Sequence, residues 1–126
     1  LEVLNSVTPF LTANPDVTLF FHTDQGVEGV GNVIRNLGLT GKVFTSGFNV
    51  SGPILDSIAS GATLLTIDQG FDYQAEASIA ACAASLAKVT VAADPLQYLS
   101  PVVITKDGGE KQIDVNAARE RLSTVQ

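Results

Sequence analysis

Three short polar segments each follow an apolar run typical of a β-strand, and they contain most of the side chains that could do chemistry. Residues 22–25 are His-Thr-Asp-Gln, Asn49 lies in residues 47–51, and Asp68 and Gln69 follow the third run. In open parallel sheets, ligands bind beyond the carboxyl ends of the strands. We therefore expect the three segments to meet at one edge of a sheet.

The groups in these segments suit a ligand that carries many hydroxyls. Each hydroxyl both donates and accepts hydrogen bonds, and amide, hydroxyl and carboxylate side chains together supply both functions. The candidate ligand-binding residues are Thr23, Asn49, Gln69, His22, Asp24 and Asp68.

A purely structural interpretation is open for part of this set. Asp24 and Ser51 precede apolar periodic segments and can act as helix N-caps, and Asn49 can be a turn residue. Gly26, Gly29 and Gly31 have the spacing G-x-x-G-x-G, which differs from the dinucleotide-binding G-x-G-x-x-G. Close packing of a helix against its sheet explains these glycines more simply.

Catalytic and metal chemistry have little support. His22 is the only histidine and Cys82 the only cysteine, which argues against a multi-histidine or thiolate metal site. No nucleophile-elbow motif is present, and no lysine lies in the polar segments that follow the first three predicted strands, as a phosphate-accepting receiver domain would require. We expect no catalytic residue, no metal and no cofactor.

Composition points to a packed domain with a small-molecule partner. Hydrophobic residues make up 45% of the 126 residues, and the net charge is −6. Four of the seven basic residues lie after residue 105, so no basic stripe suggests nucleic acid as a partner. Cys82 lies in an alanine-rich run, which predicts a buried, unreactive thiol.

Helix and strand patterns alternate along the chain. Strands are expected at residues 17–21, 42–46, 63–67 and 102–105, and helices at 1–13 (shortened or kinked by Pro9), 24–38, 51–61 and 71–89. A final short helix is expected to end at Leu122, with either Asp114 or Asn116 as its cap. Residues 94–101 read as an extended linker and 107–109 as a tight turn. This order predicts an α/β fold, a three-layer open parallel sheet of flavodoxin- or Rossmann-like topology.

Several segments resemble ribose-type sugar-binding proteins of the type I periplasmic-binding family. The likeness extends over nearly the whole chain, in order and spacing, and is carried by residues 11–17 with 20–24, 37–43 with 46–49, 66–69 and 101–107. It implies a two-lobed, non-enzymatic protein that closes on a sugar and presents it to the permease of an ABC transporter.

The resemblance also implies site residues. The family's ligand-contacting Asn, Asp and Gln fall on Thr23, Asn49 and Gln69. Two of the three positions therefore differ from the family's pattern, and only Gln69 is retained. Neutral groups at the two changed positions would bind a ligand less strongly than a charge-assisted acceptor.

The resemblance predicts a particular domain arrangement. Residues 1–97 would form part of the C-terminal lobe, and residues 98–126 a linker, strand and short helix that return to the other lobe. The chain would then be a fragment with half of the cleft, lacking the N-terminal lobe and prone to self-association.

The expected location is the periplasm or the cell exterior. Attachment to the membrane would come through the transporter or a lipoprotein anchor, and this chain contains no signal-peptide pattern. Two other functions stay open: the effector-binding region of a lac-repressor-like regulator, and a small α/β enzyme or receiver domain.

Overall fold

The computed structural model describes residues 2–24, 26–89 and 100–124, which form two compact units. The first unit comprises residues 1–68 and 102–126, and the second comprises residues 69–101. The boundary predicted between residues 97 and 98, and most of the predicted linker 94–101, lie outside the described residues.

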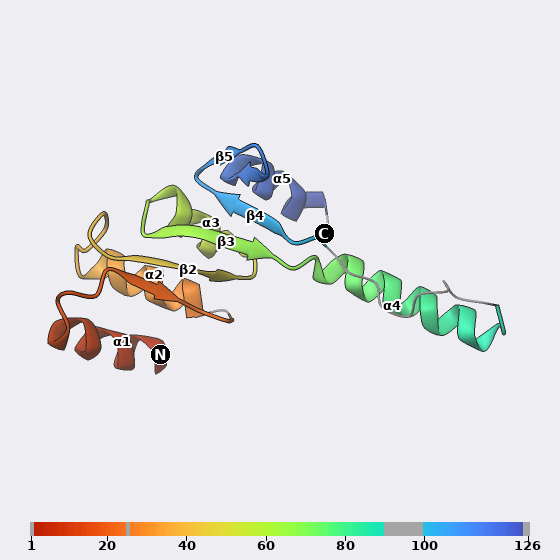
Figure 1. Ribbon diagram of the computed structural model, residues 1–126, viewed down its shortest axis with the longest axis horizontal. Coiled ribbons are helices and arrows are strands. Elements are labelled where there is room, and N and C mark those ends of the chain that lie inside the picture. Colours follow the sequence, from red (N-terminus) through yellow and green to blue (C-terminus); the bar gives the residue numbers. More distant parts are fainter. Residues whose placement is uncertain (1, 25, 90–99, 125–126) are drawn as a thin grey trace. The chain divides into compact units, whose positions relative to one another are not determined.

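In chain order the elements are α1 (Glu2–Ala13), β1 (Leu19–Phe21), α2 (Gly26–Asn36), β2 (Phe44–Phe48), α3 (Gly52–Ala59), β3 (Thr63–Asp68), α4 (Phe71–Leu86), β4 (Val102–Thr105), β5 (Asp107–Gly109), β6 (Gln112–Asp114) and α5 (Val115–Thr124) (Figure 1).

The first unit is built on one six-stranded sheet in the order β1-β2-β3-β4-β6-β5. The strands β1, β2 and β3 are parallel neighbours, because α2 and α3 carry the chain back between them. Leu19 pairs with Phe44 and Phe21 with Ser46, and the β2–β3 register shifts between Thr45 and Ser46. The predicted α/β class is confirmed.

The second half of the sheet departs from the parallel arrangement predicted from the sequence. The strand β4 runs antiparallel to β3, with Asp68 opposite Val102 and Leu65 opposite Thr105. Residues 107–109, predicted as a tight turn, form β5 and pair with β6 in an antiparallel hairpin. The segment 102–124 therefore extends the sheet of the first unit.

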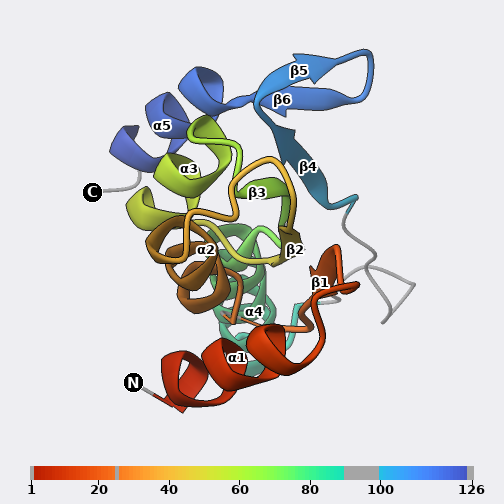
Figure 2. The same cartoon turned by 90° about the vertical axis from the view of Figure 1, so that its left-hand side faces the viewer.

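Helices cover one face of this sheet. Figure 2 shows α1, α2, α3 and α5 side by side along that face. On β1, Phe20 points toward this layer and packs edge-to-face on Phe10, whereas its neighbours Leu19 and Phe21 are 52% and 60% exposed. A three-layer arrangement needs helices on the opposite face as well, and none lies among the described residues of this unit.

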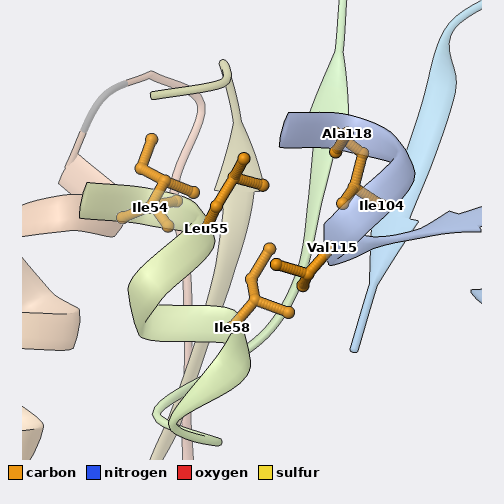
Figure 3. Packing of buried hydrophobic residues seen from close by; sticks show 7 residues of the cluster. Ile54, Leu55, Ile58, Ile104, Val115 and Ala118 are labelled. Carbon is orange, nitrogen blue, oxygen red and sulfur yellow. The ribbon is translucent and has the colours of Figure 1, made fainter. Parts of the chain in front are cut away.

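Two apolar clusters hold the helices on the sheet. One joins α2, α3, β4 and α5, where Ile58 and Val115 lie against each other (Figure 3). The other joins α1 to α2 through Leu11, Val30 and Ile34. Each fully buried Ile, Leu or Val side chain stabilises the fold by about 1.5–3 kcal/mol.

The predicted helix boundaries hold best where a cap is present. Ser51 Oγ accepts a hydrogen bond from Ile54 N at 3.3 Å at the start of α3. Asp114 Oδ1 accepts from the backbone of Asn116 and Ala117 at the start of α5. Of the two effects predicted for Pro9, a kink or a shortened helix, the shortening does not occur, because α1 runs through Pro9 to Ala13.

Glycines of α2 allow neighbouring helices to approach closely, whereas the sequence predicted close packing of this helix against the sheet. A Cβ on Gly29 would lie 2.8 Å from a methyl of Val3 in α1. A Cβ on Gly31 would overlap the hydroxyl of Ser57 in α3. These glycines therefore allow α1 and α3 to pack closely against α2 on its two sides.

The second unit contains α4, and its surroundings differ from the prediction. No residue of α4 is buried, and Cys82, predicted to be buried, is exposed. The burial of Cys82 predicted from the alanine-rich run is therefore wrong for the described structure, because small residues permit close packing but do not supply a neighbour. Large apolar side chains of this segment are exposed, with Ile79 at 70% and Leu86 at 86%.

None of the helices in the described residues is both long and apolar enough to cross a membrane.

Candidate functional site

The carboxyl ends of β1, β2 and β3 lie at one edge of the sheet, as the sequence predicted. Hydrogen bonds continue the strand pairing past the end of each strand. His22 N donates to Ser46 O and Asn49 N donates to Ile67 O, each at 2.9 Å. These bonds place the residues after β1 beside those after β2, and the residues after β2 beside β3.

Two of the predicted site residues are in direct contact at this edge. Asn49 Nδ2 donates a hydrogen bond to Asp24 Oδ1 at 3.1 Å. Asp24 is exposed and Asn49 is half-buried, so both side chains reach solvent at the rim. The structure thus joins a carboxylate from the β1 end to an amide from the β2 end.

Asn49 has a left-handed backbone conformation, with φ of 76°. Asparagine tolerates this region of backbone conformation better than most residues, although the left-handed conformation still has a higher free energy than a right-handed or extended one. Thr66 Oγ1 stabilises it by donating to the Asn49 carbonyl oxygen at 2.6 Å. A residue held so firmly at a strand end is a candidate for function, because backbone strain of this kind gathers at functional sites.

A second polar pair lies between the helices that begin at the same edge. Ser51 Oγ donates to Glu28 Oε2 at 3.2 Å while it accepts from the backbone of α3. The structural interpretation of Ser51 as an N-cap is therefore confirmed. Glu28 was not predicted from the sequence, since a helical carboxylate has no local pattern that indicates a partner 23 residues away.

His22 turns toward the interior of the unit. Its ring stacks on Phe20, with centroids 6.3 Å apart, and a Cβ on Gly26 would overlap its Nδ1 atom. The Nε2 atom is buried and has no hydrogen-bond partner among the described residues. Burial lowers the pKa of the His22 imidazole because it disfavours the charged form.

The remaining candidates lie near the edge in different settings. Thr23 is exposed directly after β1, and Asp68 is the half-buried last residue of β3. Gln69 begins the second unit, where its carbonyl oxygen accepts from Gln74 Nε2 at 2.7 Å. Among the six predicted residues, Asp24 and Asn49 are hydrogen-bonded to each other.

The chemistry of this edge is that of hydrogen bonding. No cluster of three His, Cys, Asp or Glu side chains able to hold a metal is found among the described residues. Segments 22–25, 47–51 and 66–69 contain carboxylates, amides and hydroxyls but neither lysine nor arginine. Such an edge suits hydroxyl groups and disfavours anionic ligands such as phosphates.

Solved structures similar to this chain bind sugars. An ABC transporter periplasmic solute-binding protein from Actinobacillus succinogenes with bound D-allose is 27% identical, with a TM-score of 0.73 over 94% of this chain. A solute-binding protein from Agrobacterium vitis with bound D-fucose is 26% identical, with a TM-score of 0.77 over 86% of this chain.

The chain spans only 38% and 37% of the lengths of these two proteins. A putative LacI transcriptional regulator from Bacteroides fragilis is also similar, with a TM-score of 0.69 over 80% of this chain and 34% of its own. Its identity is 18%, which shows a shared fold alone. No protein-family profile and no curated protein matches the sequence.

Proposed function

Since this chain has the fold of ribose-type ABC transporter sugar-binding proteins, we propose that it binds one side of a neutral sugar. Thr23, Asn49 and Gln69 supply ligand contacts in this proposal, with Asp24 and Asp68 beside them. In this proposal His22 does not contact the ligand, because its ring packs against Phe20 and Gly26, and it stabilises the edge through this packing.

The observation that carries the proposal is the Asp24–Asn49 pair, with its 3.1 Å hydrogen bond at the carboxyl edge of parallel strands. An amide presents both a donor and an acceptor, which match the accepting and donating functions of sugar hydroxyls. The absence of lysine and arginine from the three edge segments favours an uncharged ligand over a phosphorylated or acidic one.

The proposal includes a two-lobed protein in which the chain crosses between lobes. We place the crossings at Asp68 and Val102, the limits of the first unit, rather than near residue 98. The helix α4 would then pack on the other lobe. The exposed apolar side chains of α4, and the pairing of β4 with β3, support this assignment.

Delivery to a membrane permease, from the periplasm or cell exterior, completes the proposed role. The similar protein from Actinobacillus succinogenes is described as a periplasmic component of an ABC transporter. Three solved structures that resemble this chain at 26–27% identity are described as solute-binding proteins with bound sugars. Cell fractionation with an antibody to this chain tests the location.

Titration calorimetry on the protein as its gene encodes it tests the function. We expect binding of a neutral monosaccharide from a panel that includes D-allose, D-arabinose and D-fucose, and no binding of sugar phosphates. The variant Asn49→Gly removes the side chain without straining the left-handed backbone, and it should weaken binding by about 1–3 kcal/mol. Gln69→Ala should do the same.

The matched control is Asn36→Ala, which removes an exposed amide at the far end of α2 and should leave binding unchanged. Unchanged affinity in both Asn49→Gly and Gln69→Ala would contradict the assigned edge. The coding sequence upstream separates transport from regulation: a signal peptide supports the proposal, whereas a helix-turn-helix segment would replace it with effector binding.

A further inference from the structure

Residues 49–51, which connect β2 to α3, are hydrogen-bonded to other elements at both ends. At the first end, the carbonyl oxygen of Asn49 accepts from Thr66 Oγ1 at 2.6 Å. At the second end, Ser51 Oγ donates to Glu28 Oε2 at 3.2 Å. The strand β3 therefore holds the start of this connection, and the helix α2 holds its end.

The Ser51 hydroxyl has one partner for its proton and another for a lone pair. Its proton goes to Glu28, and its oxygen accepts from Ile54 N at 3.3 Å in the bond that caps α3. An ionised carboxylate can only accept hydrogen bonds, so Glu28 fixes the direction of the hydroxyl and leaves the lone pairs to the helix. Because a hydroxyl that donates to a charged acceptor is also a stronger acceptor, the carboxylate strengthens the cap.

Apolar packing holds Glu28 within reach of Ser51. Val27, the neighbour of Glu28 in the first turn of α2, is fully buried in the same cluster as Ile54 in the first turn of α3. A Cβ on Gly47, near the end of β2, would lie 2.4 Å from a methyl of Val27. These contacts already fix the backbones on both sides, so the Glu28–Ser51 bond orders only side chains and little conformational entropy opposes it.

We propose that Glu28 is a positioning residue, which acts through Ser51 to hold residues 49–51 in the conformation that presents Asn49 to the ligand. This inference rests on the proposed function, in which Asn49 contacts the sugar. Glu28 makes no ligand contact in this proposal, and its described bond is to Ser51. Loss of its carboxylate should therefore loosen the connection and weaken sugar binding, although every group that touches the sugar is still present.

Amide hydrogen exchange of the 126-residue chain tests the positioning without any ligand. In Glu28→Ala, exchange should become about tenfold faster at the hydrogen-bonded backbone N–H groups of Ile54 and Asn49, because the connection opens locally more often. The hydrogen-bonded N–H of Thr45, near the other end of β2, should change by less than about threefold. Equal acceleration at all three groups, or none at any of them, would overturn the proposal, since a merely structural role affects the whole unit alike.

The conservative variant Glu28→Gln separates hydrogen bonding from charge. Its side-chain carbonyl oxygen can still accept from the Ser51 hydroxyl, so exchange at Ile54 and Asn49 should stay within about threefold of the original. The matched control Glu120→Ala removes a carboxylate from an exposed position of α5 and should leave both exchange rates unchanged. Rates in Glu28→Gln as high as those in Glu28→Ala would assign the effect to charge alone and overturn the proposal.

Substitutions at both positions test whether Glu28 acts through Ser51. Ser51→Ala removes the cap of α3 and should lower the folding equilibrium constant by about two- to tenfold, and Glu28→Ala should lower it by about threefold. Once the hydroxyl is absent, the carboxylate has no group to orient, so E28A/S51A should differ from Ser51→Ala by less than about twofold. Fully additive effects of the two substitutions would overturn the proposal.

Calorimetry on the protein as its gene encodes it, with D-allose, D-arabinose and D-fucose as probes, connects the positioning to ligand binding. Glu28→Ala should weaken binding of the sugar that the original protein binds by about three- to tenfold, because the ligand must then order the connection. Glu28→Gln and Glu120→Ala should stay within about twofold of the original. Unchanged affinity in Glu28→Ala would overturn the positioning role. Faster local exchange in Glu28→Ala, with none of the three sugars bound by any form, would support the positioning and contradict the proposed function.

Discussion

Two buried threonines in neighbouring strands differ in whether their hydroxyl has a partner. Thr66 Oγ1 donates to Asn49 O at 2.6 Å, whereas Thr45 Oγ1 is buried without a partner among the described residues. A buried, unsatisfied hydroxyl costs roughly 1–3 kcal/mol, and a paired one contributes about 1 kcal/mol. The same substitution should therefore have opposite effects at the two positions.

We predict that Thr45→Val raises the free energy of unfolding by about 1 kcal/mol, because it replaces the unpaired hydroxyl with a methyl of similar size. Thr66→Val should lower that free energy by about 1–2 kcal/mol and weaken the hold on Asn49. Urea denaturation of both variants beside the original chain measures these changes. A loss of stability in both would mean that Thr45 has a partner in solution.

The His22 imidazole gives stability a pH dependence of known sign. Burial lowers its pKa in the folded chain below the ordinary value of 6.5, so the unfolded chain binds a proton at higher pH than the folded one. Stability from this group is complete above pH 6.5 and is lost as the pH falls below that value.

His22→Phe should remove this dependence, since phenylalanine keeps the stacking on Phe20 and has no proton to bind. Denaturant midpoints measured at intervals from pH 8 down to pH 5 give the comparison. The difference between the original and the variant should grow in favour of the variant as pH falls. A constant difference would indicate that the imidazole is as well solvated in the folded chain as in the unfolded one.

Sequence patterns predicted the carboxyl edge of the sheet on which Asn49 lies, but not the hydrogen bonds between the residues of that edge. The apolar runs and the polar residues after them were enough to predict that Asn49 and Asp24 would share an edge. Their hydrogen bond joins residues 25 apart and depends on the register of β1 and β2. No local pattern encodes that register, and none indicates that Thr66 holds the Asn49 backbone.

Elements with their own start signals were predicted closely, and those defined by distant pairing were not. Ser51 and Asp114 cap α3 and α5 through bonds to residues two or three positions ahead, which local sequence encodes. The direction of β4 is set by its pairing with β3, some 40 residues away along the chain. The hairpin of β5 and β6 was likewise missed, because its glycines favour a turn.

The surroundings of α4 could not be predicted from its composition. Alanine and other small residues permit close packing, but they do not say whether a neighbour is present. In the described structure no α4 residue is buried. The predicted inertness of Cys82 depended on such a neighbour.

Cys82 should therefore react quickly with a thiol reagent in the 126-residue chain, since its side chain is exposed. The rate for the same chain in denaturant provides the reference, and we expect the two rates to agree within about tenfold. In a two-lobed protein that covers α4, labelling should be markedly slower. Slow labelling in the 126-residue chain itself would mean that α4 is covered without any further segment.

At the scale of the whole molecule, apolar surface remains open on both units. The strand β1 ends the sheet, with β2 as its one partner strand among the described residues, and its Leu19 and Phe21 are more than half exposed. The second unit adds Phe71, Tyr73, Ile79, Leu86 and Val89. Apolar surface of this extent usually marks a region that another segment covers.

An edge strand offers a structural cause for the predicted self-association. The strand β4 is not that strand, because it pairs with β3 and β6 on its two sides. The two edge strands of the described sheet are β1 and β5, and β1 carries three apolar residues and no charge to discourage pairing with another chain. Identical chains that meet through such an edge form dimers or larger assemblies.

We predict that the 126-residue chain self-associates as its concentration rises, and that charge placed on β1 reverses this. Phe21→Lys puts a charge on the exposed face of the edge strand and should shift the sedimentation profile toward monomer. Leu86→Lys places the same charge on α4. Comparing the two variants shows which surface mediates association, because only a charge on that surface should shift the sedimentation profile. Sedimentation velocity across a concentration series measures both variants beside the original. An original chain that stays monomeric at every concentration would show that neither surface is adhesive, and that the exposed apolar side chains are tolerated by this chain on its own.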